Sequence, residues 1–573
     1  MRKIIPILND WTFIRESEPR IVQLPHQWNE GADEAYFGTC TYMKQFTHPG
    51  GKKVYLEVLG AINKCTVFVN GNYVGDHAGG MNAFRLDITA YLKTNNELTI
   101  DVDNTPDPDV FPNEKSQLLH GGLYGGVQMI SVGDTHFSMD MGGSDGLFIY
   151  TNELTRKTAE LMLRAYITNP QPGQYLNIDL YDAPAKIIAH IKLPVQEHLR
   201  FPLYIPYPHL WQGPKDPFLY KVKAQILDHD MVVDELVIHY GIRLFSVSTD
   251  QGFYLNHEPF PMRGIHKHSS DIPFGSATSE DLHSELFLLK GMGANALHFH
   301  HAQNLQFSYN VADQMGFFLW PGFRVTKKES EEFLYNLRMQ MRELILQNFN
   351  HPSIIFWGLG HEEEPGCDAM YLSLNNLCHH LDPTRLTMIT RGLDSSEVES
   401  VSDLLSLDLD AQESAKLSEQ WLEREELHPL TLTGIHFSED NFLEDYRSIS
   451  KLDKTAGIMS LFFNERNQSE PPSLFDGVFT RDMKKRKNLY YIIKSLWSDE
   501  PFLEILDSDI TDEDTRTIFV ATNQVHINLW EGERRLGKKN GPGIVTFPLP
   551  KGISNVWVSS GELRQSTVYL DQD

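Results

Sequence analysis

The chain has 573 residues, of which 41% are hydrophobic and 11% aromatic, which is typical of a globular protein with more than one core. Its 50 Lys and Arg against 77 Asp and Glu give a net charge of −27, which argues against nucleic acid or an anionic membrane as a partner, because both bind basic patches. Four scattered cysteines argue against a disulfide framework, and the lack of a CxxC pair argues against a typical zinc site.

The N-terminal stretch MRKIIPILNDWTF begins with basic residues but contains no long apolar region and no small-residue cleavage site. We therefore expect no signal peptide. The sequence also has no run of about twenty apolar residues, so we expect no membrane-spanning helix. Together these features predict a cytoplasmic protein.

Two β-rich regions come first in the chain. Residues 1–135 contain short runs of β-branched and aromatic residues such as KKVYLEVLG and NELTIDVDNT, and Asn70-Gly71 predicts a tight hairpin. This pattern predicts a β-sandwich. Residues 136–248 carry further strands, among them YLNIDLYD and DELVIHYGIRLF, at the spacing of an immunoglobulin-like sandwich.

Strands alternate with amphipathic helices over residues 249–498. Helices are expected in SEDLHSELFLLKGMG, NLQFSYNVADQMG and ESEEFLYNLRMQMRELILQNFN, and one face of the last carries Phe333, Leu337, Met341, Leu344 and Ile345. The eight expected strands are PMRGIHKH, ANALHFHH, FFLWPG, SIIFWGLG, LTMITRG, SDLLSLDLD, PLTLTGIHF and AGIMSLFFN. Eight such units predict a TIM barrel. Residues 499–573 return to short strands and predict a small C-terminal sandwich.

Several motifs resemble glycoside hydrolase family 2, the group of β-galactosidases, β-glucuronidases and β-mannosidases. LPHQWN and GGLYGGV resemble its jelly-roll sugar-binding domain, YGIRLF resembles the close of its immunoglobulin-like domain, and RGIHKH and NHPSIIFWGLGHEEE resemble barrel segments. The resemblance implies a jelly roll over residues 1–135, an immunoglobulin-like sandwich over 136–248, a TIM barrel bearing the active-site face over 249–498 and a β-sandwich over 499–573.

The resemblance implies that Glu362 is the general acid/base of a glycosidase. A retaining enzyme needs a second carboxylate about 5–5.5 Å away, whereas a separation of about 6.5–9.5 Å leads to inversion. The family's nucleophile, at the end of strand seven, falls on Gly434, which has no side chain that could attack. Glu439 and Glu465 are the two candidates for a displaced second carboxylate.

Histidines gather at the ends of the expected barrel strands. Where the family has an Asn before the acid/base, this chain has His361, and where it has an Arg on strand two, this chain has His298. The histidines are interpreted as sugar-contacting residues together with Trp320, or as core or surface residues without a site role, and a divalent metal held by His298, His300 and Glu362 is a third interpretation. The candidate substrate-binding histidines are His266, His268, His298, His300, His301, His361 and His436.

Three functions therefore remain open from the sequence. The first is hydrolysis of a β-linked glycoside or oligosaccharide with Glu362 as general acid and an atypical second carboxylate. The second is a catalytically inactive carbohydrate-binding protein on the same scaffold, and the third is a metal-assisted carbohydrate enzyme. A carbohydrate is the expected ligand, no cofactor is expected, and the resemblance allows a homo-oligomer.

Overall fold

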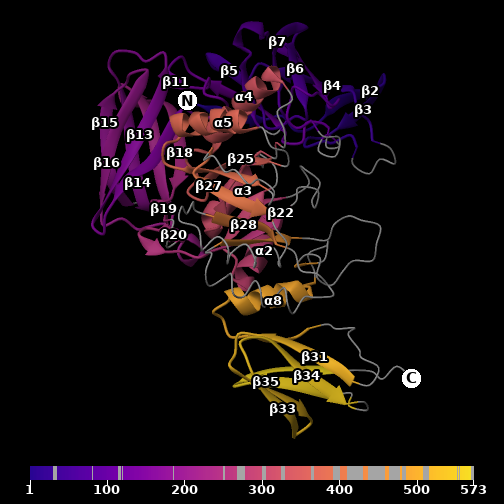
Figure 1. Cartoon of the computed structure of the whole chain (residues 1–573). Helices are drawn as coiled ribbons and strands as arrows, with labels where there is room; N and C mark the ends of the chain where they lie inside the picture. The colour runs from indigo at the N-terminus through magenta and orange to yellow at the C-terminus, as the bar shows by residue number, and fades with distance from the viewer. Residues whose placement is uncertain are drawn as a thin grey trace.

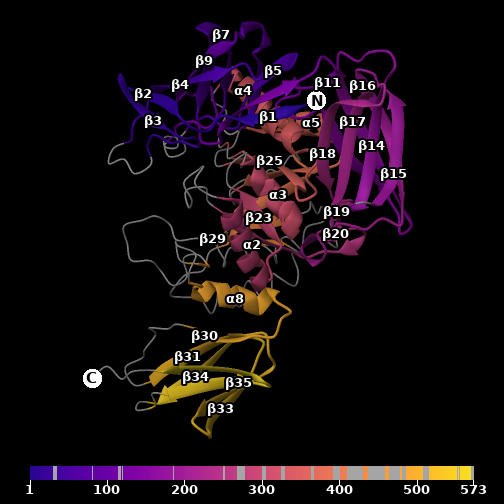
Figure 2. The ribbon, with the colours of Figure 1, turned by 180° about the vertical axis from the view of Figure 1, so that it is seen from behind.

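The computed structural model arranges the chain in four successive parts, coloured from indigo to yellow in Figure 1. Two sandwiches lie side by side at one end, the barrel lies in the middle, and the C-terminal sandwich forms the opposite end (Figures 1 and 2). The predicted boundaries between these parts, after residues 135, 248 and 498, remain predictions. The structure describes all residues except 30–34, 81, 114–117, 119–120, 185, 249–251, 268–277, 300–304, 324, 326–329, 363–366, 392–400, 409–429, 436–457, 464–477, 480–484, 507–514, 551–552, 554 and 569–573.

The first part is a jelly-roll sandwich of two antiparallel sheets. One sheet has the order β3-β2-β4-β9-β6-β7 and the other β1-β10-β5-β8. Their buried faces enclose a core that includes Trp11, Tyr42, Val67 and Ile100. The strands are β1 (Lys3–Pro6), β2 (Trp11–Arg15), β3 (Glu18–Val22), β4 (Thr39–Thr47), β5 (Lys53–Val58), β6 (Lys64–Val69), β7 (Asn72–Ala78), β8 (Phe84–Asp87), β9 (Asn95–Asp103) and β10 (Val127–Val132).

The hairpin predicted at Asn70-Gly71 is confirmed. These two residues join β6 to β7 with φ angles of 52° and 78°. Positive φ at both central positions matches the twist of the flanking strands, and Asn followed by Gly tolerates it best.

The second part is an immunoglobulin-like sandwich. Residues of β13 alternate strictly between the buried and the outer side, as expected for a strand with one face on a core. In one sheet β13 pairs with β11, β12 and β16, and the other sheet has the order β15-β14-β17-β18. The strands are β11 (His136–Phe137), β12 (Leu147–Leu154), β13 (Thr158–Thr168), β14 (Gln174–Ala183), β15 (Lys186–Pro194), β16 (His198–Pro206), β17 (Tyr220–Asp228) and β18 (Met231–Tyr240).

The third part is a closed barrel of eight parallel strands, which confirms the predicted TIM barrel. The strand order is β24-β23-β22-β29-β28-β27-β26-β25, and parallel bridges from Leu319 to Ile354 and from Gly322 to Gly358 join the two outer strands. Seven strands lie within the predicted segments, and β25 extends two residues beyond the predicted SIIFWGLG, to Glu362. The strands are β22 (Met262–Lys267), β23 (Ala296–Phe299), β24 (Phe318–Leu319), β25 (Phe356–Glu362), β26 (Leu386–Arg391), β27 (Leu404–Asp408), β28 (Leu430–Ile435) and β29 (Ile458–Phe463).

Helices cover the outside of the barrel. In the described part of the chain they are α2 (Ser279–Met292), α3 (Gln306–Met315), α4 (Glu331–Asn348), α5 (Asp368–Leu381) and α8 (Asn488–Trp497). The predicted apolar face of α4 is confirmed, because Phe333, Leu337, Met341, Leu344 and Ile345 are all at most 2% exposed. Among the described helices, none is long and apolar enough to cross a membrane.

The barrel interior is apolar at the N-terminal ends of the strands. Met262, Ala296, Phe318, Phe356 and Met388, from five different strands, contact one another in one buried cluster. A small three-stranded sheet closes this end, and its Phe245 and Phe253 rings contact Phe356, at the start of β25, edge-on. This sheet consists of β19 (Phe245–Ser248), β20 (Gly252–Leu255) and β21 (Glu258–Pro259).

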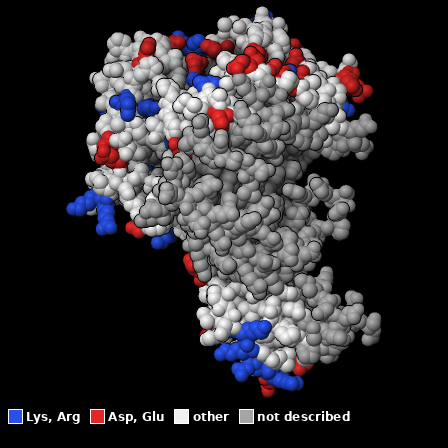
Figure 3. Space-filling view, viewed as in Figure 1, with Lys and Arg blue, Asp and Glu red and all other residues white. Residues whose placement is uncertain are grey.

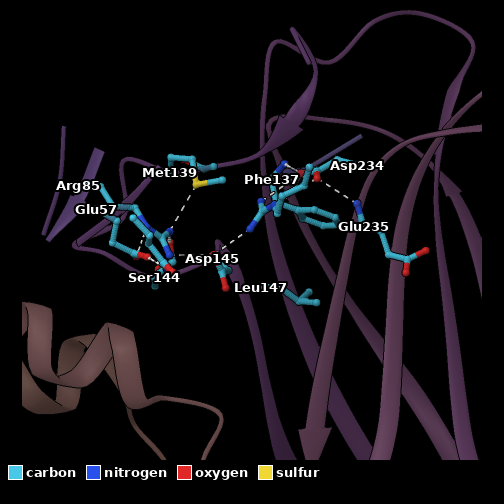
Figure 4. Close-up of polar contacts among 12 residues, drawn as sticks. Glu57, Arg85, Phe137, Met139, Ser144, Asp145, Leu147, Asp234 and Glu235 are labelled. Carbon is cyan, nitrogen blue, oxygen red and sulfur yellow. Dashed lines mark hydrogen bonds and ion pairs between the residues drawn. The ribbon is translucent and has the colours of Figure 1, made fainter. Parts of the chain in front are cut away.

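Ion pairs of two buried arginines join the two N-terminal sandwiches, in the region drawn in Figure 4. Arg85 binds Glu57 within the jelly roll and Asp145 in the segment that leads into β12. Arg2 binds the same Asp145 and also Asp234 of β18, at 2.9 and 3.1 Å. The N-terminus of the chain is therefore tied to the second sandwich.

The fourth part is a small sandwich beyond α8. Its sheets have the orders β30-β31-β34 and β33-β32-β35-β36, and Ile518, Leu529, Phe547 and Val558 lie in the core between them. Helix α8 contacts β31 and β34 and so connects this sandwich to the barrel. The strands are β30 (Leu503–Ile505), β31 (Thr515–Thr522), β32 (His526–Glu531), β33 (Arg534–Asn540), β34 (Gly543–Pro550), β35 (Asn555–Ser560) and β36 (Leu563–Val568).

Candidate active site

The C-terminal ends of the parallel strands form one rim of the barrel. Strand β25 ends at Glu362, and its register partner at the end of β26 is Arg391. Gly434 lies on β28, the seventh strand, one residue before that strand ends at Ile435. For Glu362 and Arg391 the structure describes the backbone position only. In barrels of this type the residues at this rim are the ones that carry the chemistry.

Close backbone packing explains the two glycines that precede the rim on β25. A Cβ atom on Gly358 would lie 2.8 Å from the Cα of Gly322, where β25 closes the barrel. A Cβ atom on Gly360 would lie 2.4 Å from the ring of Tyr371 on α5. The register to β26 shifts between these two glycines. Small residues therefore let β25 fit between its neighbours and bring Glu362 to the rim.

The turn before β25 is fixed by polar contacts to other elements. The side chain of Asn350 bonds two backbone groups of β12, both at 2.8 Å. His351 Nδ1 lies 2.6 Å from Asp313 Oδ2, and Asp313 Oδ1 accepts a hydrogen bond from the Ser353 backbone N–H at 3.0 Å. The NHPS motif thus positions the start of the strand that carries Glu362.

Two buried arginines donate hydrogen bonds to the backbone of the same turn. Arg385 donates to the carbonyl oxygens of Phe349, His351 and Ile354, each at 2.8 Å, and to Asp382 Oδ2 at 2.7 Å. One side chain therefore satisfies three backbone acceptors, as the planar guanidinium fork allows.

Arg243, from the YGIRLF segment, is the second arginine that bonds this turn. It donates to the carbonyl oxygens of Pro352 at 2.9 Å and Ile354 at 2.5 Å. Burial, together with the charge of Arg385, lowers the pKa of Arg243 to about 10, so it stays charged at neutral pH.

Asp382 is the counter-charge of this group. It is fully buried and also accepts a hydrogen bond from Trp357 Nε1 at 3.0 Å. Burial opposes its ionisation, but the charge of Arg385 and hydrogen bonds from Thr384 and Arg385 outweigh burial and lower its pKa. Trp357 therefore belongs to the barrel wall, where its N–H is satisfied.

A stacked pair of rings lies just below the rim. The rings of Trp320 and His298 are 4.7 Å apart at 18°, and Trp320 is 1% exposed. Trp320 Nε1 is buried without a hydrogen-bond partner among the described residues. On the neighbouring strand, His266 is the register partner of His298. The site thus contains a buried indole N–H next to an imidazole.

Comparison with known proteins identifies this barrel. Residues 246–436 match the family described as "Glycosyl hydrolases family 2, TIM barrel domain". The chain is 28% identical over 431 residues to a β-glucuronidase of Bacteroides fragilis, covering 69% of the chain and 62% of that protein. The barrel of this chain is therefore similar to the TIM barrel of glycoside hydrolase family 2.

Another curated glycosidase and a solved structure are also similar to this chain. A β-galactosidase of Thermoanaerobacter pseudethanolicus is 27% identical, and the match covers 67% of this chain and 54% of that protein. The chain spans between 40% and 62% of the length of the first three curated relatives. The crystal structure of an FMN-binding β-glucuronidase from Facaelibacterium prausnitzii L2-6 is 25% identical, with a TM-score of 0.92 over 99% of this chain and 98% of that one.

Only some of the predicted site residues lie in the described part of the chain. Glu362, His361, His266 and Gly434 are placed by their strands, and His298 and Trp320 also by their rings. The described residues contain no group of three His, Cys, Asp or Glu that could hold a metal ion. The predicted residues outside the described part are His268, His300, His301, His436, Glu439 and Glu465.

The sequence did not reveal the residues that support β25. Arg243, Asp313, Asp382 and Arg385 all lie outside strand β25 in the printed sequence, and each acts through groups that only the fold brings together. The one available signal was the occurrence of Arg243 in the family-like YGIRLF segment.

Proposed function

We propose that this chain hydrolyses a β-linked glycoside, with Glu362 as the proton donor to the leaving oxygen. The observation that carries the proposal is that a family 2 barrel ends its fourth strand in this carboxylic acid, within the GLGHEEE segment. General acid catalysis at a glycosidic oxygen requires such a group at the substrate-facing rim. Fold alone does not establish activity, so the proposal rests on this residue and is tested on it.

The second carboxylate of the reaction is proposed to come from Glu439 or Glu465. Both follow barrel strands in the sequence, β28 and β29, while Gly434 occupies the position expected for the nucleophile. A partner about 5–5.5 Å from Glu362 would attack the anomeric carbon, and one about 6.5–9.5 Å away would activate water instead. The anomeric configuration of the first product distinguishes the two.

The first substrates to test are aryl β-glucuronides and aryl β-galactosides, because the curated relatives carry those two names. Glu362→Gln should lower kcat by about 10²–10⁴-fold, since the amide cannot donate the proton. The loss should be larger for a poor leaving group such as methanol than for a nitrophenol, which leaves without protonation. Glu153→Gln, an exposed acid on β12, is the matched control.

Turnover of the methyl glycoside that survives Glu362→Gln would rule out this assignment. Glu439→Gln and Glu465→Gln identify the partner, because only the true second carboxylate should reduce turnover to a similar extent. If both variants keep full activity, the second carboxylate lies elsewhere.

A second candidate function is sugar binding without hydrolysis. Gly434 supports it, because a residue without a side chain stands at the position of the nucleophile on strand seven. In that case calorimetry should detect binding of glucuronic acid or galactose while no member of the substrate panel is turned over. Trapping of a glycosyl adduct on the protein would exclude this second function.

A further inference from the structure

The C-terminal sandwich carries a local excess of positive charge in an acidic chain. Residues 526–566 contain six Lys and Arg against three Asp and Glu, although the whole chain has a net charge of −27. Four of the six lie on β33, at Arg534, Arg535, Lys538 and Lys539. Figure 3 shows blue side chains gathered on this sandwich.

The strand register places basic and aromatic side chains on one face of the sheet. Directly paired residues share a face, and one row runs from Arg535 through Trp530 to Trp557. The next row runs from Lys538 through Asn528 and Ser559 to Arg564. We call Arg535, Lys538, Arg564, Trp530 and Trp557 the basic face.

The basic face points away from the sandwich core. Ile527, Leu529, Val556 and Val558 alternate with its residues along β32 and β35 and are at most 2% exposed. Arg535, Lys538 and Arg564 are exposed, and the two indoles are half-buried. Among the described residues, none of the three cations forms an ion pair with a carboxylate.

The aromatic part of the basic face is already rigid. The Trp530 and Trp557 rings stack at 5.1 Å and 7°, and the Arg564 guanidinium lies 5.2 Å from the Trp557 ring centre. Trp530 Nε1 donates to Ser559 Oγ, and Trp557 Nε1 donates to the Gly532 carbonyl oxygen, both at 2.9 Å. Binding a ligand here would cost little ordering of these rings.

Edge-strand protection explains only part of this arrangement. Lys and Arg on β33, an edge strand, discourage pairing with another chain. Trp530 and Trp557, however, lie on the two central strands and add apolar area to a solvent-facing surface. A row of cations beside stacked indoles suits a ligand that has both carboxylates and ring faces.

We propose that the basic face binds an acidic polysaccharide, a chain of uronic acid residues. Its guanidinium and ammonium groups pair with carboxylates, and its indole edges contact sugar rings. The sheet is about 14 Å wide across its four strands, so several sugar rings span it. This proposal rests on the proposed glycosidase function for its biological sense, because a tethered substrate reaches the barrel at a raised effective concentration.

The test is binding of the full-length chain to a polygalacturonate fragment, measured by calorimetry at low salt, with a neutral maltooligosaccharide as comparison. Arg535→Ser with Lys538→Ser should weaken binding by about tenfold or more, and Arg564→Ser should weaken it further. The control, Arg156→Ser with Lys157→Ser, removes the same charge from an exposed turn of the second sandwich and should bind like the wild type. Raising salt from about 0.05 M to about 0.5 M should also weaken binding.

Equal weakening by the control pair, or equal binding of the neutral sugar, overturns the proposal. So does tighter binding of single-stranded DNA or of anionic lipid vesicles than of polygalacturonate under the same conditions. Glu362→Gln should bind like the wild type. If that variant loses turnover but still binds polygalacturonate, the result bears on the proposed role of Glu362 in the barrel and leaves the proposal for the basic face standing. If the wild type turns over glycosides but does not bind polygalacturonate, the proposal for the basic face is wrong and the proposed hydrolysis stands.

Discussion

At the scale of single residues, the support of β25 depends on one guanidinium more than on any other side chain. Arg385 donates hydrogen bonds to three backbone carbonyl oxygens and is the counter-charge of Asp382. Both residues are at most 6% exposed. Removing Arg385 leaves the buried Asp382 carboxylate without its counter-charge and takes one donor from each of three buried carbonyl oxygens, although Arg243 still bonds Ile354 and Trp357 still bonds Asp382. Such a loss is far more costly than the loss of a surface ion pair.

Arg385→Met should therefore lower the free energy of unfolding by about 3–5 kcal/mol. Arg385→Lys should fall between the wild type and Arg385→Met, because an ammonium group cannot reach all four acceptors at once. Chemical unfolding followed by tryptophan fluorescence measures both. Adding Asp382→Asn to Arg385→Met should recover part of the loss, since the unpaired buried charge is removed. A loss below about 1 kcal/mol for Arg385→Met would contradict this role.

The same residues show why the candidate site could be predicted only in part. Glu362 was identified because its motif is contiguous, GLGHEEE, and a strand end in a barrel has a defined place. Arg385 donates to carbonyl groups of residues 349–354 while Asp382 accepts from Arg385 and Trp357, and nothing in the local sequence indicates the contacts with residues 349–357. The proposed partners of Glu362, Glu439 and Glu465, lie after β28 and β29, outside the described residues.

At the scale of elements, local sequence patterns were sufficient to predict individual helices and turns. The period of apolar residues over 331–350 predicted α4 and its buried face, and Asn70-Gly71 predicted the β6–β7 turn, because each pattern reports on contacts within one segment. The close approach of Gly358 to Gly322 was not predictable in this way, since those residues meet only where the barrel closes.

Helix α2 offers a test of an element by itself. Thr278 Oγ1 accepts from the Asp281 N–H at 3.2 Å, and Asp281 Oδ2 accepts from the Thr278 N–H at 2.9 Å, which is a reciprocal capping box. Thr278→Ala should destabilise the first turn by about 1 kcal/mol and speed amide hydrogen exchange there. Thr278→Ser keeps the hydroxyl and should exchange like the wild type. Equal exchange in the Ala and Ser variants would show that the cap is not stabilising.

At the scale of the whole molecule, the barrel is held by elements far away in sequence. The jelly roll makes polar contacts with α4: Asn82 donates to the Gln340 carbonyl oxygen at 2.7 Å, and His77 contacts Glu343 at 3.1 Å. The second sandwich holds the turn before β25 through Asn350. Both N-terminal sandwiches therefore contribute to the position of Glu362, and a change in their mutual arrangement should displace the barrel rim.

The pairing of those two sandwiches can be tested at Arg2. Its side chain is 6% exposed and binds Asp234, which is 0% exposed, while its other partner, Asp145, is 47% exposed. Arg2→Met leaves Asp234 buried without a counter-charge, although the backbone N–H groups of Phe137 and Glu235 still bond it. We expect a loss of roughly 3 kcal/mol, because breaking one side of a buried pair exposes its desolvation cost.

Asp145→Asn is the matched comparison, because it removes a charge from the same network at an exposed position and should cost less than about 1 kcal/mol. Calorimetry of the full chain should show an earlier transition for Arg2→Met, and limited proteolysis should cut the segment between β10 and β12 faster. If turnover is found, Arg2→Met should also lower it at temperatures below that transition, since the second sandwich positions the turn before β25. Identical melting of the two variants would show that the buried pair does not hold the sandwiches together.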